Sequence, residues 1–201
     1  MSSKRIKPSK QGELDGACGF YAIVNAIRSL EPELSADELF TQVLKAYLLD
    51  GDPMSFVNGT RRGSIKNTLS RVISYLHENF YFTNNYSGRE YNFVMKIPFW
   101  QLNKKPTRKE VLEIIKSANS KAGTVCIIGY DYNCGYDDYA HWSVITNSDE
   151  NGVRFFDSSG ESEFISFDLI RVDSVQSSNA SRPYNIISGD IFVLCRCDLS
   201  L

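Results

Sequence analysis

The sequence predicts an α+β domain, with a helical N-terminal half and an antiparallel β-sheet in the C-terminal half. Several segments of residues 18–119 carry apolar residues every three or four positions, which is the spacing of amphipathic helices. From residue 124 onward, the apolar residues form short runs rich in Val, Ile and Phe, a pattern typical of strands. We therefore expect a single domain over residues 1–201, with a tail (1–10), a mainly helical lobe (11–120) and a mainly β lobe (121–201).

Helices are expected where a single apolar stripe continues over three or more turns. These stripes cover residues 18–30, 35–49, 64–79 and 107–119. Two of the helices open with capping boxes, Ser35 with Glu38 and Thr107 with Glu110. Residues 50–63 hold three glycines, a proline and two arginines, and we expect them to form a loop that lines a cleft.

Strands are expected where apolar residues run continuously for a few positions. These runs cover residues 91–97, 124–130, 141–145, 152–156 and 188–194. Asn, Asp and Gly residues between 145 and 152 predict a turn, so the two flanking strands should pair as a hairpin. In such a hairpin, the start of the first strand lies opposite the end of the second.

Composition restricts the class of partner. The chain is 42% apolar and 23% charged with a net charge of −2, values of a globular protein without the basic field of a nucleic-acid binder. No apolar stretch is long enough to span a bilayer, and no signal-peptide pattern is visible. We expect no nucleic-acid partner, no membrane association and folding in a cytoplasm; delivery elsewhere by a signal-independent secretion system stays open.

The cysteines show neither a disulfide framework nor a metal site. Five of them, an odd number, are spread over the chain at positions 18, 126, 134, 195 and 197, which favours reduced thiols. Only two histidines are present, and Cys195 and Cys197 are separated by one residue, unlike the pairs of zinc sites. We expect no metal or cofactor, and we place both of these cysteines on one face of a C-terminal strand.

Cys18 is the candidate nucleophile. It lies where a polar, glycine-containing loop meets a predicted helix, and the free N–H groups and positive end of a helix favour a thiolate over a thiol. Gln11, seven residues earlier, could donate from its amide to an oxyanion on an attacked carbonyl. The alternative is that Cys18 is a buried core residue, which is common for a cysteine beside an apolar stripe.

His141 and Asp157 are the candidate partners of Cys18. A cysteine nucleophile needs a base, and the base needs a group that orients it. His77 falls in the last turn of a predicted helix, where it is explained as a cap that interacts with the helix dipole, so His141 is the better base. The predicted hairpin makes Asp157 a neighbour of His141, although Asp157 is also explained as an ordinary turn residue.

Three short blocks resemble known cysteine peptidases. Residues 141–145 (His-Trp-Ser-Val-Ile) and 155–160 (Phe-Phe-Asp-Ser-Ser-Gly) are similar to the His-Trp-Ser and Tyr-Tyr-Asp-Ser-x-Gly segments of ubiquitin-like-protein-specific proteases. Gln11, Asp15 and residues 18–20 (Cys-Gly-Phe) resemble the Gln, Asp and Cys-Gly stretch of the same proteases, with one residue more between Gln and Cys than usual. Those proteases place His and Asp first. Here the cysteine comes first, as in the papain-like cysteine peptidase superfamily, so the order resembles a circular permutation.

The resemblance implies a papain-like fold of two lobes, with Cys18 as nucleophile, His141 as general base, Asp157 as orienting acid and Gln11 as oxyanion donor. It further implies that Trp142 shields the site or contacts substrate, and that Gly19 belongs to the substrate-binding surface.

The function expected from these residues is hydrolysis of a peptide or ubiquitin-like tail through a thioester on Cys18, by a cysteine peptidase or isopeptidase. A protein or peptide would then be the substrate. Two alternatives stay open. The same triad would serve an effector-type glutamine deamidase, transglutaminase or acyltransferase, and the chain could also be a non-catalytic binding module on a papain-like scaffold.

Overall fold

The computed structural model describes residues 7–8, 16–84, 87–100, 105–133, 138–158, 164–174 and 181–199. The helices are α1 (Cys18–Leu30), α2 (Ala36–Leu48), the one-turn α3 (Ser55–Asn58), α4 (Arg62–Asn79) and α5 (Arg108–Asn119), with a short 3-10 turn at Phe167–Leu169. The strands are β1 (Phe82–Thr83), β2 (Glu90–Lys96), β3 (Thr124–Asn133), β4 (Asp138–Ser148), β5 (Gly152–Phe155), β6 (Phe164–Ser166), β7 (Ile170–Val172) and β8 (Tyr184–Asp198).

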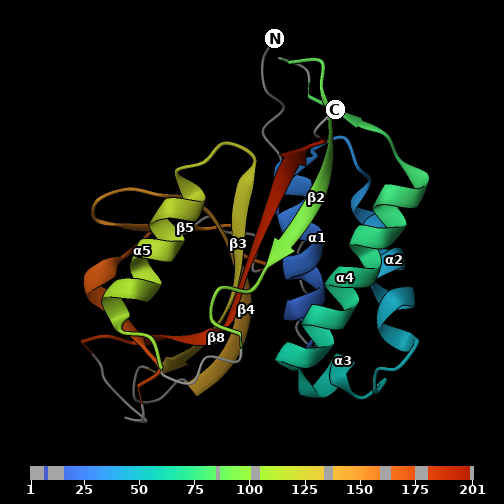
Figure 1. Cartoon of the computed structure of the whole chain (residues 1–201). Helices are drawn as coiled ribbons and strands as arrows, with labels where there is room; N and C mark the ends of the chain where they lie inside the picture. The colour runs from blue at the N-terminus through green and yellow to red at the C-terminus, as the bar shows by residue number, and fades with distance from the viewer. Residues whose placement is uncertain are drawn as a thin grey trace.

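The elements form three layers. Helices α1, α2 and α4 cover one face of the sheet and α5 covers the other (Figure 1). Because neighbouring side chains of a strand point to opposite faces, alternate residues of β3 enter the two cores: Val125 and Ile127 pack under α1, and Cys126 and Ile128 pack on the side of α5. The expected α+β class is confirmed, since helices pack on both faces of one sheet.

The sheet is largely antiparallel, in the order β1-β2-β8-β3-β4-β5-β6. Strand β8 lies in the interior of the sheet and pairs with β3 on one side. On its other side it pairs first with β7, in parallel, and then with β2. Strand β2 comes before α5 in the sequence, so the sheet also takes strands from the predominantly helical half of the chain.

The helix predictions agree closely with the structure. Both predicted N-caps are present, with Ser35 accepting a hydrogen bond from the backbone of Glu38, and Thr107 and Glu110 forming a reciprocal capping box. Helix α4 begins at Arg62, two residues before the predicted position 64. Its start has no signal in the sequence, because the N-cap residue Arg61 makes no side-chain capping hydrogen bond. The loop predicted at residues 50–63 also contains the single turn α3.

The C-terminal strand is much longer than the predicted residues 188–194. Strand β8 covers Tyr184–Asp198, and the short strands β6 and β7 had no signal of their own in the sequence. Cys195 and Cys197 do lie on one face of β8, with their Sγ atoms 3.4 Å apart. They are free thiols, as are Cys18 and Cys126, and burial raises the pKa of Cys126 to about 12.

His77 lies in the last turn of α4, as predicted, and its interaction with the helix dipole stays a prediction. Its Nε2 accepts a hydrogen bond from the backbone N–H of Phe93 at 3.1 Å, a contact with the sheet that the sequence did not predict. His77 therefore joins the end of α4 to β2. Among the described residues, no helix combines the length and the apolar character needed to cross a bilayer.

Candidate active site

Helix α1 presents Cys18 as its first residue. Ala17 occupies the N-cap and has no side chain that could bind the first N–H groups, so the positive end of the helix stays directed at Cys18. The N–H of Gly16 donates to the carbonyl of Phe56, which holds the segment before α1 against α3. Cys18 is only 6% exposed, and this small opening faces a cleft of about 840 Å³.

The β4–β5 hairpin brings His141 and Asp157 together. His141 lies on β4, and Asp157 comes two residues after the end of β5, where the backbone N–H of Phe156 still donates to Val144 at 2.8 Å. The imidazole Nε2 and the carboxylate Oδ2 are 2.9 Å apart. The predicted neighbourhood of these two residues across the hairpin is thus confirmed.

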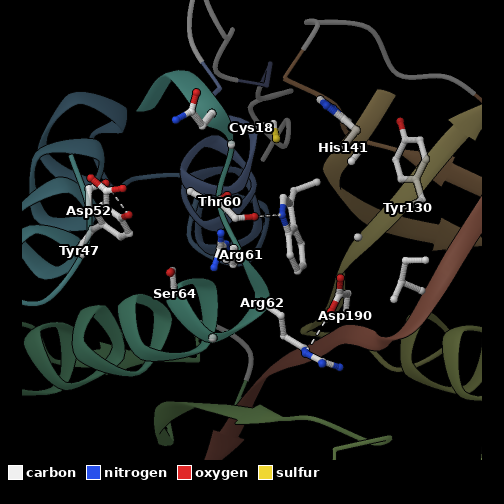
Figure 2. A pocket seen from close by; sticks show the side chains of 18 of the residues that line it. Cys18, Tyr47, Asp52, Thr60, Arg61, Arg62, Ser64, Tyr130, His141 and Asp190 are labelled. Atoms are coloured by element: carbon white, nitrogen blue, oxygen red, sulfur yellow. Dashed lines mark hydrogen bonds and ion pairs between the residues drawn. The ribbon is translucent and has the colours of Figure 1, made fainter. Parts of the chain in front are cut away.

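The surroundings of His141 favour its charged form. Burial lowers the pKa of the imidazole, but the hydrogen bond that its ring donates to Asp157 and the interaction with the Cys18 side chain outweigh burial, and together they raise this pKa to about 9. Because Nε2 is engaged by Asp157, Nδ1 is the ring nitrogen left to face the thiol. Cys18 and His141 face one another at one end of the cleft (Figure 2).

Two aromatic rings flank the imidazole. Tyr130 is the cross-strand partner of His141 in the β3–β4 ladder, and its ring centroid lies 5.6 Å from the imidazole at an interplanar angle of 71°. Tyr139, two residues before His141, lies at 6.1 Å and 89°. Edge-to-face contacts of this kind restrict the rotation of a side chain. The contact of Tyr130 with His141 was not predictable from local spacing, because it depends on the register of β3 against β4.

The segment between α3 and α4 closes the site from the helical side. The indole N–H of Trp142 donates to the carbonyl of Thr60 at 2.9 Å, in a fully buried hydrogen bond (Figure 2). Gly19 packs directly against the side chains of Thr60 and Ile65. Trp142 and Gly19 are therefore both buried against this segment, and their predicted contact with substrate stays a prediction.

The far end of the cleft is closed by an ion pair. Arg62, the first residue of α4, reaches across to Asp190 on β8 with Nε 3.4 Å from Oδ1 (Figure 2). Burial raises the pKa of Asp190 to about 6 even though Arg62 opposes this shift. No side chain beyond glycine fits at position 129 on the neighbouring strand, because a Cβ there would come within 2.8 Å of the Asp190 Cβ.

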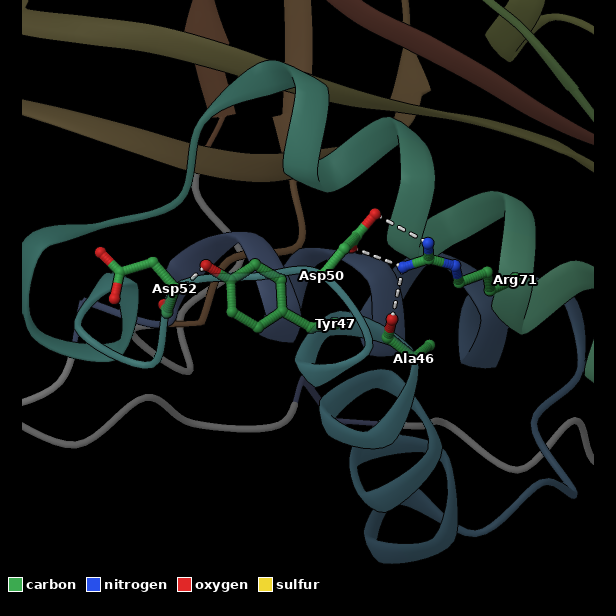
Figure 3. Close-up of polar contacts among 5 residues, drawn as sticks. All are labelled: Ala46, Tyr47, Asp50, Asp52 and Arg71. Atoms are coloured by element: carbon green, nitrogen blue, oxygen red, sulfur yellow. Dashed lines mark hydrogen bonds and ion pairs between the residues drawn. The ribbon is translucent and has the colours of Figure 1, made fainter.

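A third wall is formed by the end of α2 and the residues that follow it. The hydroxyl of Tyr47 donates to the carbonyl of Asp52 at 2.8 Å, and Arg71 of α4 binds both carboxylate oxygens of Asp50 at 2.7 and 2.8 Å (Figure 3). Arg71 also donates to the carbonyl of Ala46 at 2.8 Å. The expectation that residues 50–63 line a cleft is confirmed, since Asp50–Asp52 and Asn58–Gly63 all border it.

The structure therefore brings Cys18, His141 and Asp157 together at one place. Gln11 lies outside the described residues, so its role as oxyanion donor stays a prediction. Within the described part of the chain, no three His, Cys, Asp or Glu side chains converge in a way that would hold a metal ion. In comparisons of sequence, the chain matches no protein-family model and no curated protein.

Proposed function

We propose that this protein is a cysteine peptidase or isopeptidase that cleaves a peptide or ubiquitin-like tail. The observation that carries the proposal is a thiol at the N-terminus of a buried helix, beside an imidazole whose second nitrogen is held by a carboxylate at 2.9 Å. Nucleophile, base and orienting acid are the parts that acyl transfer through a thioester requires. The scaffold, a helix carrying the cysteine against an antiparallel sheet carrying the histidine, is the arrangement we propose as papain-like.

In the proposed reaction, the Cys18 thiolate attacks the carbonyl carbon of the scissile amide, and the electron pair of the carbonyl moves to its oxygen. The backbone N–H groups at the start of α1 point to where this oxyanion forms, and Gln11 is the further donor implied by the resemblance. When the oxyanion collapses, the C–N bond breaks and the His141 imidazolium gives its proton to the leaving amine. Cys18 is then a thioester and His141 is neutral.

Neutral His141 next takes a proton from water, whose oxygen attacks the thioester carbonyl. Collapse of this second oxyanion releases the carboxylic acid and restores the thiolate and the imidazolium. Asp157 stabilises the charged ring in both steps without accepting its proton. The cleft of about 840 Å³ that begins at Cys18 is of a size that receives several residues of an extended chain.

The first experiment measures how fast each cysteine reacts with iodoacetamide as a function of pH, by mass spectrometry, in the wild type and in His141→Ala. We expect Cys18 alone to be labelled fast at about pH 6, where an ordinary thiol is slow, and to lose this reactivity without His141. Cys126 is the internal control, since it is buried and free. Slow labelling of Cys18 at all pH values would contradict a catalytic cysteine.

The second experiment identifies the reaction. Ubiquitin-like proteins and peptide libraries with fluorogenic amides are incubated with the wild type, Cys18→Ala and His141→Ala, and both substitutions are expected to abolish cleavage while the circular dichroism spectrum is retained. Release of ammonia from glutamine side chains without cleavage of any amide bond in the backbone or isopeptide would instead identify a deamidase.

A further inference from the structure

One residue outside the proposed triad contacts the elements of both its nucleophile and its base. Thr60 lies between α3 and α4, and its carbonyl oxygen accepts the hydrogen bond from the indole of Trp142, the residue after His141. Its side chain packs against Gly19, the residue after Cys18. Thr60 thus contacts the residue that follows Cys18 and the residue that follows His141.

Both contacts are tight. The Trp142–Thr60 hydrogen bond is 2.9 Å long and buried, and Thr60 itself is 8% exposed. A Cβ added at Gly19 would overlap the Oγ1 of Thr60 and the Cδ1 of Ile65 and would lie 3.2 Å from the Cβ of Thr60, so position 19 has no room for a side chain while these two residues keep their places. The first turn of α1 therefore lies directly against the side chain of Thr60.

The hydroxyl of Thr60 contributes no hydrogen bond to this arrangement. Within the described residues its Oγ1 is buried and has no partner. Burying a hydroxyl without a partner is unfavourable, so we expect the Thr60 side chain to act here through its shape and not through its polarity. Valine has almost the same shape and therefore serves as a matched replacement.

We infer that Thr60 is a positioning residue for Cys18 and His141, because it fixes the start of α1 against β4 and so sets the separation of the thiol and the imidazole. The inference rests on the proposed function. A displacement of about 1 Å between reacting groups lowers a rate roughly a hundredfold. A shift of either Thr60 contact by this amount would therefore be enough to impair the action of the imidazole on the thiol. In the proposed reaction, Thr60 itself touches no reacting atom.

The experiment is a double-mutant cycle with Gly19→Ala, Thr60→Ala and the double variant. Gly19→Ala alone pushes α1 away from Thr60, and we expect it to slow the alkylation of Cys18 at about pH 6 by at least about tenfold. In the Thr60→Ala background the overlapping Oγ1 is gone, and Ile65, the other neighbour, meets the new Cβ only with the end of a flexible side chain. Gly19→Ala should therefore cost less than about threefold in that background.

Two further variants separate positioning from stability. Thr60→Val keeps the shape and is expected to keep the wild-type pH profile of alkylation, whereas Thr60→Ala shifts it. Trp142→Phe removes the donor to the Thr60 carbonyl, and we expect it to change the pH profile of Cys18 alkylation in the same way as Thr60→Ala. This variant also tests the inference if Gly19→Ala does not fold. A role in stability alone would lower the melting temperature of these variants and leave the pH profile of Cys18 unchanged.

The inference is overturned if Gly19→Ala has the same effect with and without Thr60→Ala, or if Thr60→Val behaves like Thr60→Ala. In either case a wild-type Cys18 that still reacts fast at about pH 6 leaves the proposed function standing. A wild-type Cys18 that reacts slowly removes both. The two failures are therefore distinguished by the wild-type measurement in the same series.

Discussion

Replacing Asp157 by alanine should remove most of the electrostatic support of the His141 imidazolium. The pKa of His141 is raised from 6.5 to about 9 against the opposing effect of burial. At about 1.36 kcal/mol for each tenfold change, this difference corresponds to roughly 3 kcal/mol in favour of the charged ring. The carboxylate at 2.9 Å is the closest fixed negative charge, and an opposite charge at such a distance changes a pKa by about 1–3.

We therefore expect Asp157→Ala to lower the pKa of His141 by about 1–3, because burial continues to disfavour the cation when the carboxylate is gone. Proton NMR of the imidazole Cε1–H against pH measures this directly. The chain has only two histidines, and His77, bound to the backbone of Phe93, provides an unaffected reference resonance. The pH profile of the proposed peptide cleavage should change with it: a wild-type rate that falls as pH rises through about 9 should fall at lower pH in the variant, with activity reduced but measurable.

Asp157→Asn is the matched control for charge. Its amide oxygen still accepts from Nε2, so the ring keeps its orientation while the negative charge is lost. The asparagine variant should therefore retain more activity than the alanine variant although both lower the pKa of His141. A pKa for His141 that stays near 9 in Asp157→Ala would refute the electrostatic reasoning, since the charge would then have another source.

Three other outcomes follow from described contacts. Tyr130→Leu removes the ring that packs on His141 and should broaden the pH profile of Cys18 alkylation or move it to higher pH. Tyr130→Phe keeps this ring and should behave as the wild type. Equal effects of the two substitutions would exclude a role for the ring. Tyr47→Phe, which removes the buried hydroxyl that donates to the carbonyl of Asp52, should lower the free energy of unfolding in urea by about 1 kcal/mol, and an unchanged midpoint would show that water replaces the bond. Cys126, whose pKa burial raises to about 12, should resist iodoacetamide at about pH 9 until the protein is unfolded, so labelling of the native protein would contradict its placement in the core.

Much of the fold was predictable because local chemistry determines it. The side chains of Ser35 and Thr107 accept N-cap hydrogen bonds from backbone N–H groups three residues later. Because this signal is local, the starts of α2 and α5 are predictable from the sequence. Helix α4 has no such cap, and its start at Arg62 was placed two residues too late. The full length of β8 was not predictable, since strand ends depend on which neighbours offer hydrogen bonds, and these neighbours come from distant parts of the chain.

The candidate site divides in the same way. His141 and Asp157 were expected to meet because a hairpin relates them through a short turn, and the structure places them 2.9 Å apart. Tyr130 and Thr60 were not identified, although both lie close to the proposed pair. Their contacts arise from strand register and from the packing of one helix start against a loop, which no periodicity or spacing encodes.

The interior position of β8 has a consequence for the synthesis of the protein. Strands β2 and β3 become neighbours only through β8, and Phe192 and Leu194 of β8 complete the core beneath α1. During translation, α1 and the β4–β5 hairpin leave the ribosome long before this strand does, so their apolar surfaces have no complete sheet to cover them. We therefore expect Cys18 and His141 to acquire their fixed relation only once β8 has joined the sheet. On the ribosome the candidate site is therefore incomplete, and it forms only when the sheet is complete.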